Sequence, residues 1–151
     1  GASRAVLYSL IKMNFKKIVI FNRTINNSKK MVNEILSKIK KTKIKFIYKN
    51  LKEINNYLHD TNILINTTPM GMKNFKNLDI DLNFLNKNAI VYDLIYNPIE
   101  TKLIKKAKEL KIKNINGIKM LIYQAEKAFL YWFKKKPKNS NIQKILENKI
   151  K

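Results

Sequence analysis

Apolar and polar positions along the chain follow two periods, one typical of helices and one typical of short strands. Helical spacing predicts helices over residues 3–13, 28–40, 100–110, 118–133 and 140–150, with shorter turns near 51–58 and 82–85. Short apolar or alternating runs predict strands over residues 16–21, 43–48, 62–66, 89–95 and 113–116. Pro137 is expected to end the longest helix. Strands that alternate with helices predict an α/β fold, a doubly wound parallel sheet followed by C-terminal helices.

In a sheet of this kind, ligands bind at the carboxyl ends of the strands. The residues that follow the first predicted strand are Asn22, Arg23 and Thr24. An NAD site usually has an acidic residue here for the ribose 2′-hydroxyl, whereas an NADP site has an arginine for the 2′-phosphate. Arg23 therefore favours NADP, with Thr24 and Asn27 as further donors. The alternative interpretation is an ordinary exposed arginine in a turn.

Two other segments carry weaker signals for the same cofactor. Gly1 and Ala2 lead directly into the first predicted helix, as the last glycine of a dinucleotide fingerprint does where pyrophosphate meets a helix N-terminus. Thr67 and Thr68 follow the 62–66 strand, where small hydroxylic side chains can line a ribose. A simple helix start and a simple strand stop explain the same residues equally well.

Composition limits the other classes of function. The 151 residues suit about one domain, and the net charge of +22 suggests a polyanionic partner. However, the cations are 30 Lys and only 2 Arg, and Lys, Ile and Asn make up about half of the chain. This is the signature of AT-rich codons, and nucleic-acid readers depend on arginine. A solvated lysine surface is therefore favoured, while a basic nucleic-acid-binding module stays open as an alternative.

The same composition argues against metal and membrane sites. The chain has no Cys and one His, so neither a thiolate site nor a multi-histidine site is expected, and no metal is predicted. The apolar runs are too short to span a bilayer, and no secretory signal is visible. We therefore expect a cytoplasmic protein with no membrane partner, and a homodimer remains open.

Four motifs stand in the order and spacing of the shikimate dehydrogenase family: residues 22–24 (Asn-Arg-Thr), 66–72 (Asn-Thr-Thr-Pro-Met-Gly-Met), 92–98 (Tyr-Asp-Leu-Ile-Tyr-Asn-Pro) and 116–125 (Asn-Gly-Ile-Lys-Met-Leu-Ile-Tyr-Gln-Ala). The opening residues also look like the tail of the family's Gly-Ala-Gly-Gly-Ala loop. Nearly the whole chain resembles that family's cofactor-binding domain and C-terminal helices. One residue departs from the pattern, because Lys119 stands where the family usually has a second glycine. Its side chain either crowds the nicotinamide or points outward.

The resemblance implies an NADP-binding, Rossmann-like domain over residues 1–117. The C-terminal helices over 118–151 would then pack on it and line the substrate cleft. The cofactor-binding residues that it implies are Gly1 and Ala2 at the pyrophosphate, Asn22, Arg23, Thr24, Ile25, Asn26 and Asn27 around the adenosine phosphate, Thr67 at the ribose, and Leu94, Gly117 and Met120 at the nicotinamide. Tyr96 and Gln124 would reach the substrate.

The implied reaction is the reversible, NADPH-dependent reduction of 3-dehydroshikimate to shikimate, on the way to chorismate and the aromatic amino acids. In the family, the acid–base Lys and Asp belong to a substrate domain that precedes this region, so no catalytic residue is assigned in this chain. We expect the chain to be a fragment that lacks the sheet's first strand and neither folds stably nor catalyses alone. The alternatives are a quinate/shikimate dehydrogenase, which can accept NAD, and a non-catalytic Rossmann remnant.

Overall fold

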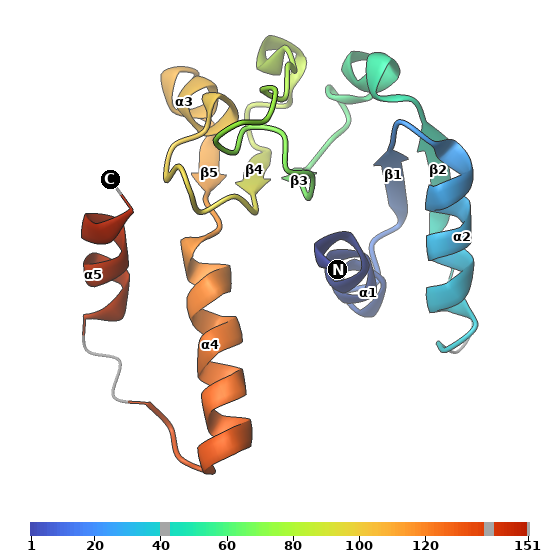
Figure 1. Ribbon diagram of the computed structural model, residues 1–151. Coiled ribbons are helices and arrows are strands. Elements are labelled where there is room, and N and C mark those ends of the chain that lie inside the picture. Colours follow the sequence, from blue (N-terminus) through green and yellow to red (C-terminus); the bar gives the residue numbers. More distant parts are fainter. Residues whose placement is uncertain (40–42, 138–140, 151) are drawn as a thin grey trace. The chain divides into compact units, whose positions relative to one another are not determined.

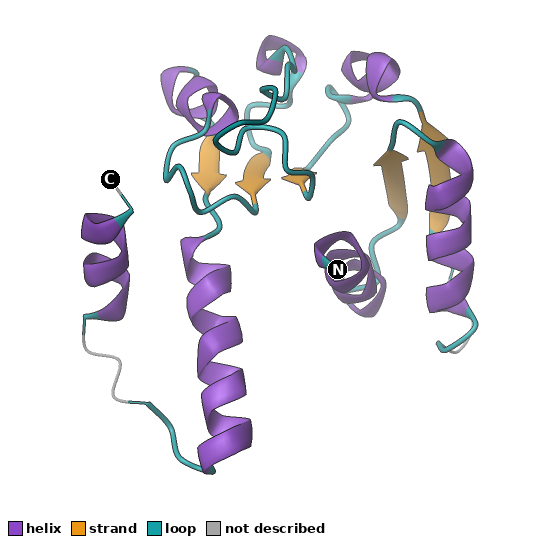
Figure 2. Cartoon of the chain, in the orientation of Figure 1, coloured by secondary structure: helices purple, strands orange, loops and turns teal. Residues whose placement is uncertain are grey.

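The computed structural model describes residues 1–39, 43–137 and 141–150, and its helices alternate with its strands (Figures 1 and 2). The helices are α1 (Ala2–Lys12), α2 (Ile25–Leu36), α3 (Lys102–Glu109), α4 (Ile118–Phe133) and α5 (Ile142–Lys149). The strands are β1 (Lys17–Phe21), β2 (Lys45–Lys49), β3 (Ile63–Asn66), β4 (Ile90–Asp93) and β5 (Lys113–Ile115). Two 3₁₀ helices lie at Leu51–Tyr57 and Leu82–Phe84. Every strand pair is parallel, which confirms the predicted α/β class.

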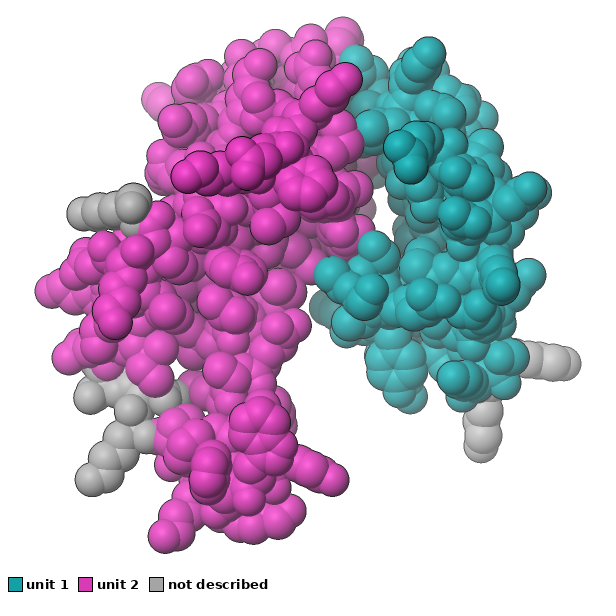
Figure 3. All heavy atoms as spheres, in the orientation of Figure 1, with its two compact units in different colours: residues 1–60 teal, residues 61–151 magenta. Residues whose placement is uncertain are grey.

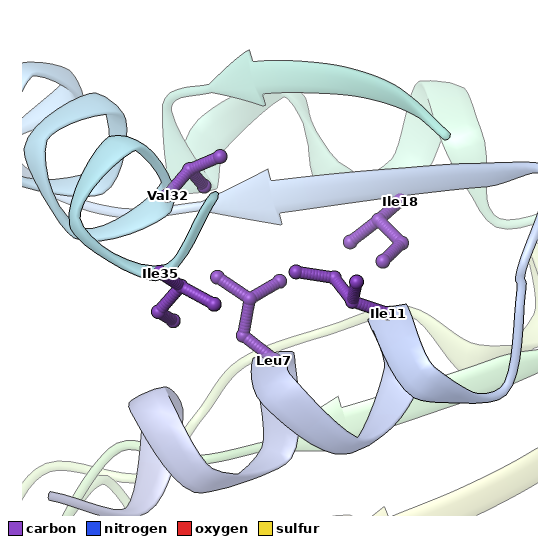
Figure 4. Close-up of a cluster of buried hydrophobic side chains, with 5 residues drawn as sticks. All are labelled: Leu7, Ile11, Ile18, Val32 and Ile35. Carbon is purple, nitrogen blue, oxygen red and sulfur yellow. The ribbon is translucent and has the colours of Figure 1, made fainter. Parts of the chain in front are cut away.

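The chain divides into two compact units, residues 1–60 and 61–151 (Figure 3). In the first unit, β1 and β2 pair in parallel, with Val19 opposite Ile47. The apolar faces of α1, β1 and α2 close a core in which the side chains point toward one another (Figure 4). Its buried members are Leu7, Ile11, Ile18, Val32 and Ile35. The core thus packs α1 against the beginning of β1 and the second half of α2.

The second unit is built on a parallel sheet in the order β3–β4–β5. Asn66 and Asp93 stand opposite each other at the carboxyl ends of β3 and β4. Val91 at the centre of the sheet is fully buried, as is Ala107 of α3, the helix that packs against β4 and β5 (Figure 1). The sheet therefore places the ends of two neighbouring strands, and the loops that follow them, side by side.

Helix α4 is buried only at its start. Ile118 is fully buried, whereas Trp132 is 70% exposed and Tyr131 is 74% exposed. Phe129, Leu130 and Phe133 are also exposed. The second half of α4 thus presents large apolar side chains to solvent, and α5 packs against α4.

Most element positions agree with the sequence, but several ends differ. Helix α2 begins at Ile25 rather than residue 28, and β4 ends at Asp93, so Leu94 and Ile95 lie beyond the strand. Helix α4 ends at Phe133 because Lys134 adopts a left-handed conformation (φ 54°), so the expectation that Pro137 ends it was wrong. Parts of the predicted 28–40 and 140–150 helices, at residues 40 and 140, lie outside the described residues.

Within the described residues, β1 pairs only with β2, and β3 pairs only with β4. The predicted boundary between a cofactor domain and C-terminal helices at residue 117 stays a prediction. None of the described helices combines the length and the apolar character needed to cross a bilayer.

Candidate functional site

The turn between β1 and α2 carries the residues predicted to bind the adenosine phosphate. The N–H of Asn22 donates to the carbonyl of Lys49 (3.1 Å), which extends the β1–β2 pairing to the edge of the turn. The Asn22 Oδ1 then accepts from the N–H of Thr24 (3.3 Å). This Asx turn leaves Arg23 exposed at the tip.

Helix α2 begins directly after this turn without a capping side chain. Thr24 is the N-cap residue, yet its side chain makes no capping hydrogen bond, and the first turn holds no acidic residue. The N–H groups at a helix start attract anions. Arg23 and the start of α2 are neighbours in the chain, and they carry a guanidinium and backbone N–H donors, which are groups that bind phosphate.

Helix α1 begins at Gly1, which is its N-cap residue. The Gly1 carbonyl accepts from the N–H groups of Arg4 (3.1 Å) and Ala5 (3.3 Å), and no acidic residue stands in the first turn. A Cβ added at Gly1 would meet nothing within 4 Å. No side chain caps the start of α1, and the arrangement of Gly1 and Ala2 is compatible with their predicted place near a pyrophosphate.

The end of β3 is organised by the buried side chain of Asn66. Its Nδ2 donates to the Met70 carbonyl (3.1 Å) and to Asp93 Oδ1 (3.0 Å). Its Oδ1 accepts from the N–H (2.9 Å) and the hydroxyl (2.8 Å) of Thr68. Asn66 thus fixes both ends of the loop that contains Thr67, which is half-buried.

Asp93 is fully buried at the end of β4 and accepts three hydrogen bonds. Besides the bond from Asn66, Oδ1 accepts from the N–H of Ile95 (3.2 Å), and Oδ2 accepts from the Thr101 hydroxyl (2.6 Å). Thr101 in turn caps α3 by accepting from the N–H of Ile104 (3.3 Å). Burial raises the pKa of the Asp93 carboxyl, and the three hydrogen bonds oppose that rise.

Gly117 brings the start of α4 against the segment that follows β4. Its N–H donates to the Ile95 carbonyl (2.9 Å). A Cβ on Gly117 would lie 2.0 Å from the Leu94 carbonyl oxygen, so only glycine allows this approach. Leu94 and Gly117, both expected at the nicotinamide, are therefore adjacent.

The other predicted residues of the second unit lie near this junction or farther along α4. Met120 is half-buried and Lys119 is exposed, both in the first turn of α4. Tyr96 is 37% exposed in the loop after β4. Gln124 is exposed on α4, and within the described residues no hydrogen bond joins it to Tyr96. The structure thus brings Leu94, Tyr96 and Gly117 into one neighbourhood, whereas Gln124 lies farther along α4.

Comparison with known proteins identifies this arrangement. Residues 2–121 match the family model described as shikimate / quinate 5-dehydrogenase. The chain belongs to the shikimate / quinate 5-dehydrogenase family. It is 40% identical over 156 residues to a shikimate dehydrogenase (NADP(+)) of Methanococcus maripaludis, a match that covers 100% of this chain and 53% of that protein. The chain thus spans about half the length of the curated relatives it matches.

Solved structures of the family share the fold. A shikimate 5-dehydrogenase from Listeria monocytogenes, in complex with shikimate and NAD, matches with a TM-score of 0.82 at 30% identity and covers 97% of this chain and 52% of that one. A shikimate dehydrogenase in complex with NADP⁺ matches with a TM-score of 0.81 at 34% identity, covering 100% and 53%. These matches confirm the Rossmann-like fold and the family resemblance seen in the motifs.

The sequence reasoning missed the polar network of Asn66, Asp93 and Thr101. Asn66 and Asp93 stand within the motifs at residues 66–72 and 92–98, but the motifs alone give neither residue a role. A usable signal was present, because acidic residues are scarce in this chain, and Asp93 is the residue that ends a strand of otherwise buried type. Among the described residues, no cluster of His, Asp or Glu side chains suited to a metal ion is found.

Proposed function

We propose that the protein containing this chain is an NADP-dependent shikimate dehydrogenase, which reversibly reduces 3-dehydroshikimate to shikimate, and that this chain supplies its cofactor-binding part. The observation that carries the proposal is the turn after β1, where exposed Arg23 stands beside the uncapped start of α2. The family membership supports the reaction class. When bound, the nicotinamide of NADPH supplies the hydride, and the residues of this chain bind and orient the cofactor.

The donors of the β1–α2 turn fit a 2′-phosphate better than a 2′-hydroxyl. Residues 22–27 contain no carboxylate, which an NAD site uses to accept from the ribose hydroxyl. The guanidinium of Arg23 can bind a phosphate through two parallel hydrogen bonds. These features favour NADP over NAD.

The second unit offers groups for the nicotinamide and the substrate. We propose that Thr67 borders the cofactor ribose, and that the backbone at Leu94 and Gly117 faces the nicotinamide. Tyr96 and Gln124 carry a phenol and an amide that can donate hydrogen bonds to substrate oxygens. We assign no proton transfer to this chain, so its proposed part is binding and orientation.

Replacing Arg23 tests the cofactor assignment. A hydrogen bond to a charged group contributes about 1.5–3 kcal/mol, so Arg23→Ala should weaken NADP binding roughly 10- to 150-fold while NAD binding barely changes. Dissociation constants for both cofactors, measured by calorimetry on the protein at its natural length, would show this. Equal losses for NADP and NAD would mean that Arg23 is structural.

Two comparisons sharpen this test. Lys38→Ala removes one positive charge just beyond the other end of α2 and should leave both affinities unchanged. A rate assay that offers shikimate or quinate with NADP⁺ or NAD⁺ separates the candidate activities. Shikimate with NADP⁺ should give the highest kcat/KM, whereas preference for quinate with NAD⁺ would identify the quinate branch.

A further inference from the structure

The hydrogen bonds of Asp93 link, directly or through one further residue, the segments of the second unit that carry the predicted cofactor and substrate residues. Through Asn66, the carboxylate holds the loop after β3, which contains Thr67. Through Ile95, it holds the segment after β4, which contains Leu94 and Tyr96. The network therefore connects two loops that are distant in sequence.

The network continues to the start of α4. Both backbone polar groups of Ile95 are hydrogen-bonded, because its N–H donates to Asp93 (3.2 Å) and its carbonyl accepts from Gly117 (2.9 Å). On its other oxygen, Asp93 holds Thr101, which caps α3. One side chain thus sets the positions of two loops and two helix starts.

We propose that Asp93 is a positioning residue, whose three hydrogen bonds fix the loops after β3 and β4 and the start of α4 so that the nicotinamide end of the cofactor is held in reacting geometry. This inference rests on the proposed function. Asp93 is fully buried and touches no solvent, so it acts through Asn66, Ile95 and Thr101 and not through contact with the cofactor.

An ionised carboxylate is suited to this task because both of its oxygens accept. The three donors around Asp93 are an amide, a backbone N–H and a hydroxyl, and no ion pair of Asp93 is present among the described residues. An asparagine in this place is neutral and has one acceptor oxygen, so it cannot accept hydrogen bonds on both sides as the carboxylate does. Asp93→Asn therefore keeps the size of the side chain and disrupts one side of the network.

The experiment compares two ligands that differ at the nicotinamide. Adenosine 2′,5′-bisphosphate carries the adenosine 2′-phosphate but lacks the nicotinamide, whereas NADPH carries both. In the protein at its natural length, Asp93→Asn should lower kcat/KM roughly 100-fold, because displacements near 1 Å cost about that much. It should weaken NADPH binding and leave adenosine 2′,5′-bisphosphate binding unchanged. That retained binding also shows that the variant is folded.

Matched variants complete the design. Asp81→Asn makes the same substitution at an exposed aspartate that accepts from the N–H of Asn83 (3.0 Å), and it should change neither binding nor rate. If Asp93→Asn does not fold, Thr101→Val removes the hydroxyl that donates to Oδ2 and caps α3, and it should weaken NADPH binding while leaving adenosine 2′,5′-bisphosphate binding unchanged. Thr101→Ser restores the hydroxyl and should restore the rate.

The outcomes separate the two proposals. Equal losses for both ligands, or no loss for either, would overturn the role of Asp93. Absence of NADPH and bisphosphate binding in the unchanged protein would instead overturn the proposed function. A rate for Thr101→Ser as low as that for Thr101→Val would show that the hydroxyl is not what holds the network.

Discussion

At the residue scale, position 117 requires glycine because of the space around it and not because of its backbone conformation. Its φ of −74° is open to any residue, but a Cβ would lie 2.0 Å from the Leu94 carbonyl oxygen. Gly117→Ala should therefore destabilise the protein by about 1–3 kcal/mol, because backbone must move. Urea unfolding of the protein at its natural length would measure this. An unfolding free energy equal to that of the unchanged protein would contradict the packing argument.

At the element scale, α3 ends in a Schellman motif that carries strain. The N–H of Lys111 donates to the Lys108 carbonyl (2.9 Å) and that of Ile112 to the Ala107 carbonyl (2.9 Å), with Lys111 at φ 56°. Glycine adopts this conformation without strain, so Lys111→Gly should be about 1 kcal/mol more stable than Lys111→Ala. Thermal unfolding of the two variants, which lose the same charge, checks this. Equal stabilities would show that the left-handed turn costs nothing here.

The elements also show how far the sequence could predict the structure. The bounds of α4 were predicted from its apolar spacing and Gly117, and the parallel order followed from the alternation of strands and helices. The early start of α2 was missed because Thr24 makes no capping hydrogen bond and no acidic residue marks the first turn. The Asp93 network was missed because it joins β3, β4 and α3, and pairings across 27 residues leave no local pattern.

At the scale of the whole molecule, the chain leaves apolar and backbone surface uncovered. Within the described residues, β1 and β3 each have one partner strand, and the second half of α4 exposes aromatic side chains. We expect the 151-residue chain alone to unfold without a single sharp transition. Calorimetry and circular dichroism on heating would test this, and a stable, cooperative melt would contradict it. The protein at its natural length should melt cooperatively.

The exposed half of α4 also gives the protein a built-in optical reporter. Trp132 is the only tryptophan in the chain, and it is 70% exposed. Indole fluorescence depends on contact with water, so emission excited at wavelengths that tyrosine does not absorb describes the surroundings of Trp132 on this one helix. Any surface that covers α4 will move that emission toward shorter wavelengths, without an added label and without a change in the sequence.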